Sequence, residues 1–163
     1  MTCKDVIGNI ETYPIGGKTK DVLDLEWYET TKRVMRKKTA SGSEIIIQFL
    51  KEGNRLKEGD ILYEDAEKVV LVNILPCDAI QVTPRSIYEM GVICYEIGNK
   101  HLPLFLQDDH VLIPYEKPLE RLLKASGYQV TKAHTKLLNN LKAGAESHHH
   151  HDHDHGHDHH HDH

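Results

Sequence analysis

Eleven histidines fall within residues 148–163, and this concentration is the clearest chemical signal in the chain. The stretch reads HHHHDHDHGHDHHHDH, so it contains only His, Asp and one Gly. Imidazole nitrogen is a good ligand for nickel, copper and zinc. Because an unperturbed imidazole has a pKa of about 6.5, most of these rings are neutral at pH 7 and can donate a lone pair. We therefore predict that the tail holds several divalent ions loosely. The predicted ligands are His148, His149, His150, His151, His153, His155, His157, His159, His160, His161 and His163.

The tail has no apolar surface to bury, so we expect it to be disordered without a ligand. Two plainer interpretations are a purification tag and a solvated extension without function. A cloned tag is usually an unbroken block of histidines, whereas Asp152, Asp154 and Asp158 interrupt this one at irregular intervals. Metal storage, detoxification, sensing and delivery all fit the tail equally well.

Three histidines lie outside the tail, and His101 is the first of them. It follows Gly98-Asn99-Lys100, a helix stop signal, so its side chain is expected to be exposed. One imidazole makes a poor metal site, but the two-fold axis of a homodimer would bring two copies together. The alternative interpretations are a partner for the helix dipole and an ordinary surface histidine.

His110 and His134 carry weaker signals. His110 follows Asp108-Asp109 in an expected loop between strands, where it predicts either a weak second metal site or a polar hairpin. His134 is expected at the end of the last strand, beside the tail, as a surface histidine or as an extra ligand if the tail folds back.

Residues 1–76 are predicted to form a small all-β domain. A turn cluster at 40–43 predicts a pair of strands around Gly42, and residues 27–39 have no clear pattern. Further strands are expected at residues 44–50, 60–63 and 69–75. Pro76-Cys77-Asp78 interrupts this pattern, so the domain boundary is placed between residues 76 and 77.

Residues 77–143 are predicted to form a ferredoxin-like βαββαβ domain, so the fold class is α+β. Strands are expected at residues 79–83, 103–107, 111–115 and 128–133, with a second helix over 117–126. The first helix is expected to start near Pro84, where Ser86 and Glu89 fit a helix start, and to stop at Gly98-Asn99. The first helix is expected to bury one face made of Ile87, Met90, Val92, Ile93 and Ile97, with Cys94 as a small buried residue on it. A short amphipathic helix is expected over 136–142, and residues 144–163 form the tail.

The composition excludes several classes of protein. Without residues 148–163, 21 acidic residues oppose 20 basic ones, so the chain lacks the positive charge of a nucleic-acid-binding protein. No apolar run is long enough to span a membrane, and the start of the chain lacks the pattern of a secretory signal. Three widely spaced cysteines form no disulfide framework, which favours a reducing cytoplasm. No catalytic motif is present, so no enzymatic activity is expected.

Residues 94–101, CYEIGNKH, resemble the signature of the urease accessory protein UreE family of nickel metallochaperones. The stretches TASG at 39–42, LKEGDIL at 56–62 and DHVL at 109–112 are also similar to the family, as is the His-rich end. The resemblance covers essentially the whole chain, and its CYxxGN(K/R)H block is quite specific.

The resemblance implies a peptide-binding-like first domain and a second domain that binds metal and forms a homodimer. His101 would meet its symmetry mate and bind nickel, with zinc or copper able to compete. The urease accessory GTPase would be the partner, within the complex that loads nickel into apo-urease. His110 aligns with a region where some members place extra ligands, but Asp108-Asp109 stands where those members often have more histidines. A nickel or zinc storage protein without a dedicated partner is the alternative function.

Overall fold

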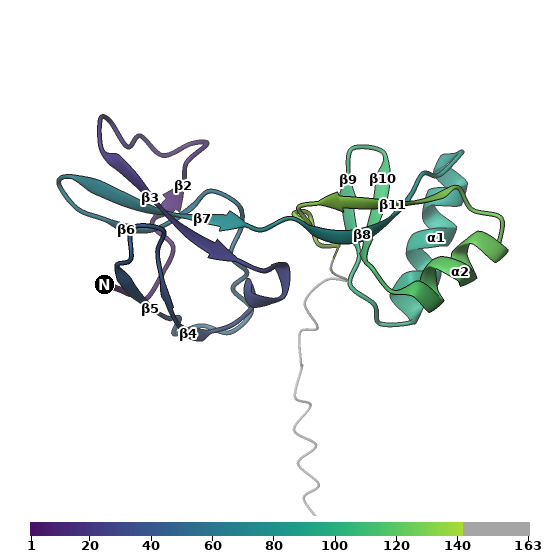
Figure 1. Cartoon of the computed structure of the whole chain (residues 1–163), viewed down its shortest axis with the longest axis horizontal. Helices are drawn as coiled ribbons and strands as arrows, with labels where there is room; N and C mark the ends of the chain where they lie inside the picture. Colours follow the sequence, from purple (N-terminus) through teal and green to yellow (C-terminus); the bar gives the residue numbers. More distant parts are fainter. Residues whose placement is uncertain (142–163) are drawn as a thin grey trace, which may run out of the picture.

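The structure is a computed structural model, and it describes residues 1–141. Two lobes lie side by side and are joined by the chain between β7 and β8 (Figure 1). The amino-terminal lobe is built from strands, and the carboxy-terminal lobe carries both α-helices. This arrangement confirms the predicted α+β class. The predicted tail ligands lie outside the described residues.

Two sheets form the amino-terminal lobe, with strand orders β2-β6-β7-β3 and β1-β5-β4. Their strands are β1 (Thr2–Cys3), β2 (Gly8–Asn9), β3 (Thr19–Leu25), β4 (Val34–Lys38), β5 (Glu44–Gln48), β6 (Asp60–Glu64) and β7 (Lys68–Ile74). A short 3-10 helix, η1 (Trp27–Glu29), precedes β4. Strand β5 buries Ile45 and Ile47 on alternate positions, as expected for a strand with one face in the core. The predicted pair of strands around Gly42 is confirmed, since Gly42 takes a φ of 85° in the β4–β5 turn.

The carboxy-terminal lobe has the sheet order β11-β8-β10-β9, with each neighbouring pair antiparallel. Both helices cover the same face of this sheet (Figure 1). The elements are β8 (Cys77–Val82), α1 (Ile87–Asn99), β9 (Phe105–Gln107), β10 (His110–Pro114), α2 (Lys117–Ala125) and β11 (Val130–Thr135). The order of elements and the place of the first strand between the last and the third confirm the predicted ferredoxin-like topology.

Helix α1 begins at the start that Ser86 and Glu89 predicted. The Ser86 hydroxyl caps it by accepting the Glu89 N–H at 3.1 Å, so Pro84 lies before the helix rather than in its first turn. The predicted buried face is also partly wrong, because Ile87 is 92% exposed while Ile93 and Ile97 are buried. At about 100° per residue, Ile87 lies roughly 120° around the helix from Ile93, outside the face that packs on the sheet.

The segment after β11 is extended, so the helix predicted over 136–142 is wrong for the described part of that range. Strand β9 offers a free edge, and the segment takes it: Leu106 N–H donates to Asn139 O at 3.0 Å, and Leu141 N–H donates to Leu104 O at 2.8 Å. Leu137 is buried on the sheet face away from the helices, in a cluster with Ala79, Phe105 and Leu112. Backbone pairing and this buried leucine outweigh the weak helical pattern.

The same segment ties the two lobes together. Lys136 Nζ donates to Glu58 Oε1 at 2.8 Å and to Asn73 Oδ1 at 2.7 Å, and both acceptors belong to the amino-terminal lobe. Trp27 meets Phe105 edge to face, with ring centroids 5.7 Å apart. These contacts hold the lobes in a defined relation at their junction. Within residues 1–141, no helix is long and apolar enough to cross a bilayer.

Replacing Leu137 by alanine is expected to lower the free energy of unfolding by about 2–5 kcal/mol, because it empties a fully buried site. Urea denaturation of the full chain measures this change. Leu141→Ala is the matched control, since Leu141 is exposed. The control is expected to cost about 0.5 kcal/mol or less, as most surface substitutions do. Equal destabilisation by the two variants would contradict the anchoring role of Leu137.

Candidate metal centre

His101 lies immediately after helix α1, in a backbone conformation that few residues adopt. The Lys100 N–H still bonds to the last turn of the helix, and the His101 N–H donates to Gly98 O at 3.0 Å. His101 has a φ of 55°. This value lies in the left-handed region, where His is more common than most residues with a side chain. The side chain is exposed, which confirms the predicted exposure. The imidazole is therefore presented to solvent from a well-defined turn.

An apolar stripe on α1 leads toward this turn. Tyr88 is 81% exposed and Tyr95 is 71% exposed. Their spacing of seven residues places them on one side of the helix. Gly91 lies between them on the same side without a side chain. The two rings give this side of the helix an exposed apolar surface. We call Tyr88, Gly91 and Tyr95 the α1 stripe.

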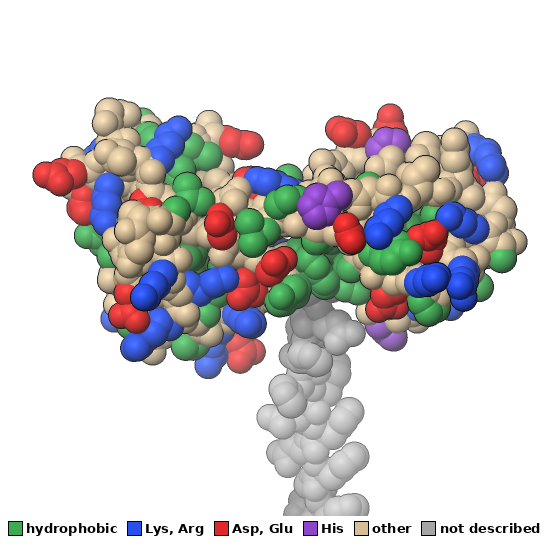
Figure 2. All heavy atoms as spheres, viewed as in Figure 1, with side chains coloured by type: hydrophobic (Ala, Val, Ile, Leu, Met, Phe, Trp, Pro, Cys, Tyr) green, Lys and Arg blue, Asp and Glu red, His purple; other side chains and the backbone are tan. Residues whose placement is uncertain are grey.

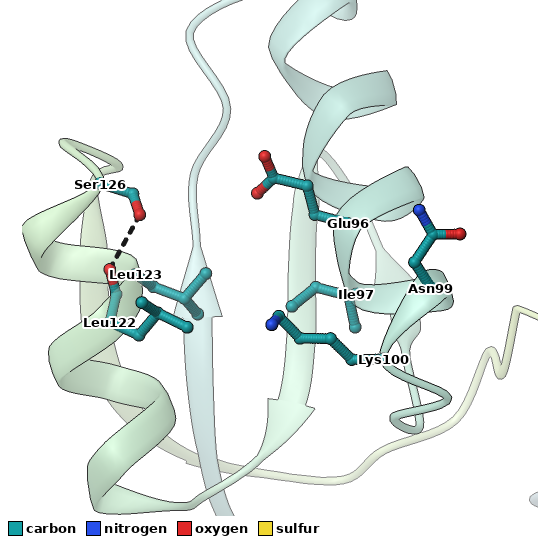
Figure 3. Close-up of a pocket in the computed structure, with 7 residues that line it drawn as sticks. All are labelled: Glu96, Ile97, Asn99, Lys100, Leu122, Leu123 and Ser126. Atoms are coloured by element: carbon teal, nitrogen blue, oxygen red, sulfur yellow. Dashed lines mark hydrogen bonds between the residues drawn. The ribbon is translucent and has the colours of Figure 1, made fainter.

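A hollow of about 520 Å³ separates the end of α1 from α2. Figure 3 shows Glu96 and Ile97 of α1, and Lys100 just after the helix, reaching toward Leu122 and Leu123 on α2. No histidine or cysteine lines the hollow, so its walls offer a metal oxygen ligands alone, with Glu96 as the one carboxylate. This hollow flanks the candidate centre but does not form it.

His110 begins strand β10 rather than lying in a loop, and it pairs across the hairpin with Gln107. Its Nδ1 lies 3.2 Å from Thr83 Oγ1, and in the tautomer that donates Nδ1–H to this hydroxyl the Nε2 lone pair is left for a ligand. Asp108, in the turn, has a φ of 52°, and the Gln107 Oε1 atom is buried without a hydrogen-bond partner among the described residues. The structure thus supplies one ring and several oxygens here, but no second imidazole.

His101 and His110 lie at opposite ends of α1. Thr83, which contacts His110, precedes the helix, whereas His101 follows it. The helix runs from Ile87 to Asn99. At the usual rise per residue its length is about 20 Å. One chain therefore cannot form a single site from both rings.

His134 lies on β11 opposite Asp78 on β8, as the cross-strand register requires. The His134 Nδ1 lies 3.0 Å from the Asp78 carboxylate, and Lys132 Nζ lies 3.5 Å from its other oxygen. The hydrogen bond from His134, with the nearby charge of Lys132, lowers the pKa of Asp78. Because a carboxylate only accepts, Nδ1 carries the proton and the His134 Nε2 lone pair points elsewhere.

No group of three or more His, Cys, Asp or Glu side chains is placed to hold a metal ion within residues 1–141. The three cysteines do not supply thiolate ligands in place of such a group. Burial raises the pKa of Cys77 and Cys94, and it raises the pKa of Cys3 to about 11. A thiol must lose its proton to bind a metal well. Imidazoles are therefore the best metal ligands that this part of the chain offers.

The neighbours of His110 and His134 were not identified from the sequence. Asp78 is 56 residues from His134 in the sequence. Thr83 follows β8 and Gln107 ends β9, whereas His110 begins β10. Only the strand register brings them together. No local pattern in β8 or β10 specifies these partners.

The fold and these side chains define a class of protein: a two-lobed α+β protein that exposes single imidazoles instead of a closed catalytic pocket within its described residues. The family model for the N-terminal domain of the UreE urease accessory protein matches residues 3–75, and the model for its C-terminal domain matches residues 78–163. The chain belongs to the UreE family of urease accessory proteins, and its role is in urease maturation rather than catalysis.

Relatives from several bacteria are similar over most of the chain. The urease accessory protein UreE of Flavobacterium johnsoniae is 47% identical, over 91% of this chain and 90% of its own length. The UreE of Actinobacillus pleuropneumoniae is 41% identical, over 90% of this chain and 80% of its own. The UreE of Acetivibrio thermocellus is 38% identical, over 91% and 99%.

Replacing Cys94 by alanine is expected to leave metal stoichiometry and affinity unchanged, because the half-buried Sγ atom packs against Met90 and burial raises the pKa of the thiol. Isothermal titration with nickel measures both quantities. A lower stoichiometry in the Cys94→Ala variant would show that a thiolate takes part in ligation.

Proposed function

We propose that this protein collects Ni(II) and delivers it, through the urease accessory GTPase, for assembly of the urease active site. The observation that supports this most is the exposed imidazole of His101 on a fixed turn beside the α1 stripe. A delivery site needs ligands that hold an ion without enclosing it, because the ion must leave again. An exposed ring at a surface meets that need.

We propose that the working form is a homodimer joined through the carboxy-terminal lobes. The exposed rings of Tyr88 and Tyr95 give the α1 stripe apolar area to bury. A two-fold axis beside the end of α1 would place two His101 rings at one ion, where a single chain offers one. Open coordination positions on such an ion would remain for tail histidines or for the receiving protein.

His110 and the tail histidines complete the proposed ligand set. His110 would act as a weaker single ligand through its free ring nitrogen, apart from the His101 pair. The tail histidines at 148–163 would act as a reservoir that raises the local nickel concentration near the dimer. Zinc or copper would compete, since both accept imidazole.

We place this delivery in the cytoplasm, with the urease accessory GTPase and apo-urease as partners. The three free thiols fit a reducing compartment. In this scheme residues 1–76 and 77–143 act as separate domains, with nickel bound by the second. Nickel or zinc storage without a partner is the second candidate, and the number of tail histidines favours it. A pull-down with the purified GTPase separates the two: binding favours delivery, and no binding at any nickel concentration favours storage.

Removing the tail after Ser147 is expected to lower the number of nickel ions bound while leaving some nickel on each dimer. Equilibrium dialysis with oligomeric state followed in parallel measures both. If the truncated dimer binds no nickel, the body site does not exist.

In the truncated chain, His101→Ala is expected to weaken nickel binding by about tenfold or more, since even the outer partners of a metal ligand are worth that much. The dimer is expected to persist, because the α1 stripe is intact. His134→Ala is the matched control, as it also removes one exposed imidazole and is expected to change affinity less than about twofold. Equal effects of the two variants would contradict the special role of His101.

Lowering the pH to about 5 is expected to release bound nickel, because protons compete with the metal for imidazole nitrogen. Dialysis of the loaded full chain across this range measures the release. Full retention of nickel at pH 5 would indicate ligation by carboxylates or thiolates instead.

A further inference from the structure

Strand β4 is an unpaired edge with an unusual charge. It pairs with β5 on one side, and no strand of the described chain lies on its other side. Five of the seven residues from 32 to 38 are basic: Lys32, Arg33, Arg36, Lys37 and Lys38. The strand runs along the lower border of the amino-terminal lobe in Figure 1, and Figure 2 shows Lys and Arg side chains gathered there.

The hydrogen-bond pattern shows which backbone groups are free. Thr39 N–H donates to Ser43 O and Phe49 N–H donates to Arg33 O, both at 2.9 Å, so the odd-numbered residues bond to β5. In an antiparallel pair the alternate residues point away. Val34, Arg36 and Lys38 therefore direct their N–H and C=O groups outward.

The other side of β5 confirms this alternation. Ile46 lies opposite Arg36, and its N–H donates away from β4 to Met1 O at 2.9 Å. The outward edge of β4 ends at Ala40, whose N–H donates to Val22 O on β3. The outward edge from Val34 to Lys38 is thus open for pairing.

The side chains of Val34, Arg36 and Lys38 are also exposed to solvent. Val34 is 58% exposed and the Arg36 side chain is 69% exposed. Three glutamates pair with this basic run: Glu29 with Lys37 at 2.6 Å, Glu44 with Arg36 at 3.4 Å and Glu52 with Arg33 at 3.4 Å. Five positive charges against three negative ones leave the edge positive. The Glu44 and Glu52 pairs are exposed and therefore weak enough to exchange.

We propose that β4 is a docking edge for an extended acidic segment of another protein, which would add as a strand beside Val34, Arg36 and Lys38. The free backbone groups would pair with the segment, and the basic side chains would select acidic residues at alternate positions. This inference goes beyond nickel delivery and uses none of the proposed metal ligands.

Other occupants fit less well. A second copy of β4 would set lysines and arginines opposite each other, which repels. A nucleic acid would meet the charge, but its phosphates cannot donate to the outward carbonyl groups. The basic residues could serve only to keep the edge unpaired, as they do in many sheets, and the experiment must distinguish this case.

The test uses the full chain, labelled with ¹⁵N, and an acetylated and amidated heptapeptide of alternating glutamate and valine. We expect saturable binding, with amide exchange slowed severalfold at Val34, Arg36 and Lys38. Exchange at Met35 and Lys37 is expected to stay unchanged, because β5 already protects those amides. The same peptide with N-methyl groups at alternate residues is expected to bind about tenfold more weakly or worse, because it cannot complete the ladder.

Two double variants separate the edge from general charge. Arg36→Gln with Lys38→Gln is expected to weaken peptide binding by roughly fivefold or more. Lys117→Gln with Arg121→Gln removes the same charge from exposed positions on α2 and is expected to change binding less than about twofold. A dispersed NMR spectrum confirms that each variant is folded.

Three results would overturn the proposal. The first is no binding of the peptide, which would leave the basic residues as guards of an unused edge. The second is equal binding of the N-methylated peptide, or displacement of the peptide by an oligothymidylate of equal charge. Either outcome would show that charge alone, without backbone pairing, explains peptide binding. The third is equal weakening by the α2 control variant.

Discussion

The packing of Ile93 and Ile97 against the carboxy-terminal sheet determines where the chain presents its candidate metal ligand, His101. These two side chains fix the rotation of α1, and the chain turns just after the helix, at Lys100 and His101, which places His101 outside the lobe. The same rotation turns Tyr88 and Tyr95 to solvent. The packing of these two side chains therefore determines the exposure of both His101 and the α1 stripe. A shift of the helix register would bury either the imidazole or the stripe.

The ferredoxin-like topology keeps His101 and His110 of one chain apart. His110 lies at the end of the sheet where α1 begins, and His101 lies where α1 ends. A closed site of three ligands would hold nickel too firmly for transfer, whereas isolated rings bind firmly only when another chain adds ligands. In the proposed function, this separation means that firm nickel binding requires a second chain to add a ligand. The nickel ion is released when that second ligand is lost.

Much of the fold could be predicted, because local signals mark its boundaries. Gly98 lies in the last turn of α1 and Gly127 follows α2, and the β-branched runs located β5 and β7 within two residues. Strand β3 was not identified, since its buried Asp21 is satisfied by Ser41 from a distant turn. The extended course near Leu137 depends on the free edge of β9, and the Thr83 and Asp78 contacts depend on strand register. Such pairings arise between segments far apart in sequence, so local patterns could not reveal them.

The most direct test of the central claim is nickel-edge anomalous diffraction from crystals of the loaded chain truncated after Ser147. The account predicts a nickel peak on a two-fold axis, within coordination distance of His101 from both chains, with the α1 stripes packed beside it. A peak bound by His101 of one chain alone, or no peak at this residue in crystals that hold nickel elsewhere, would contradict the account.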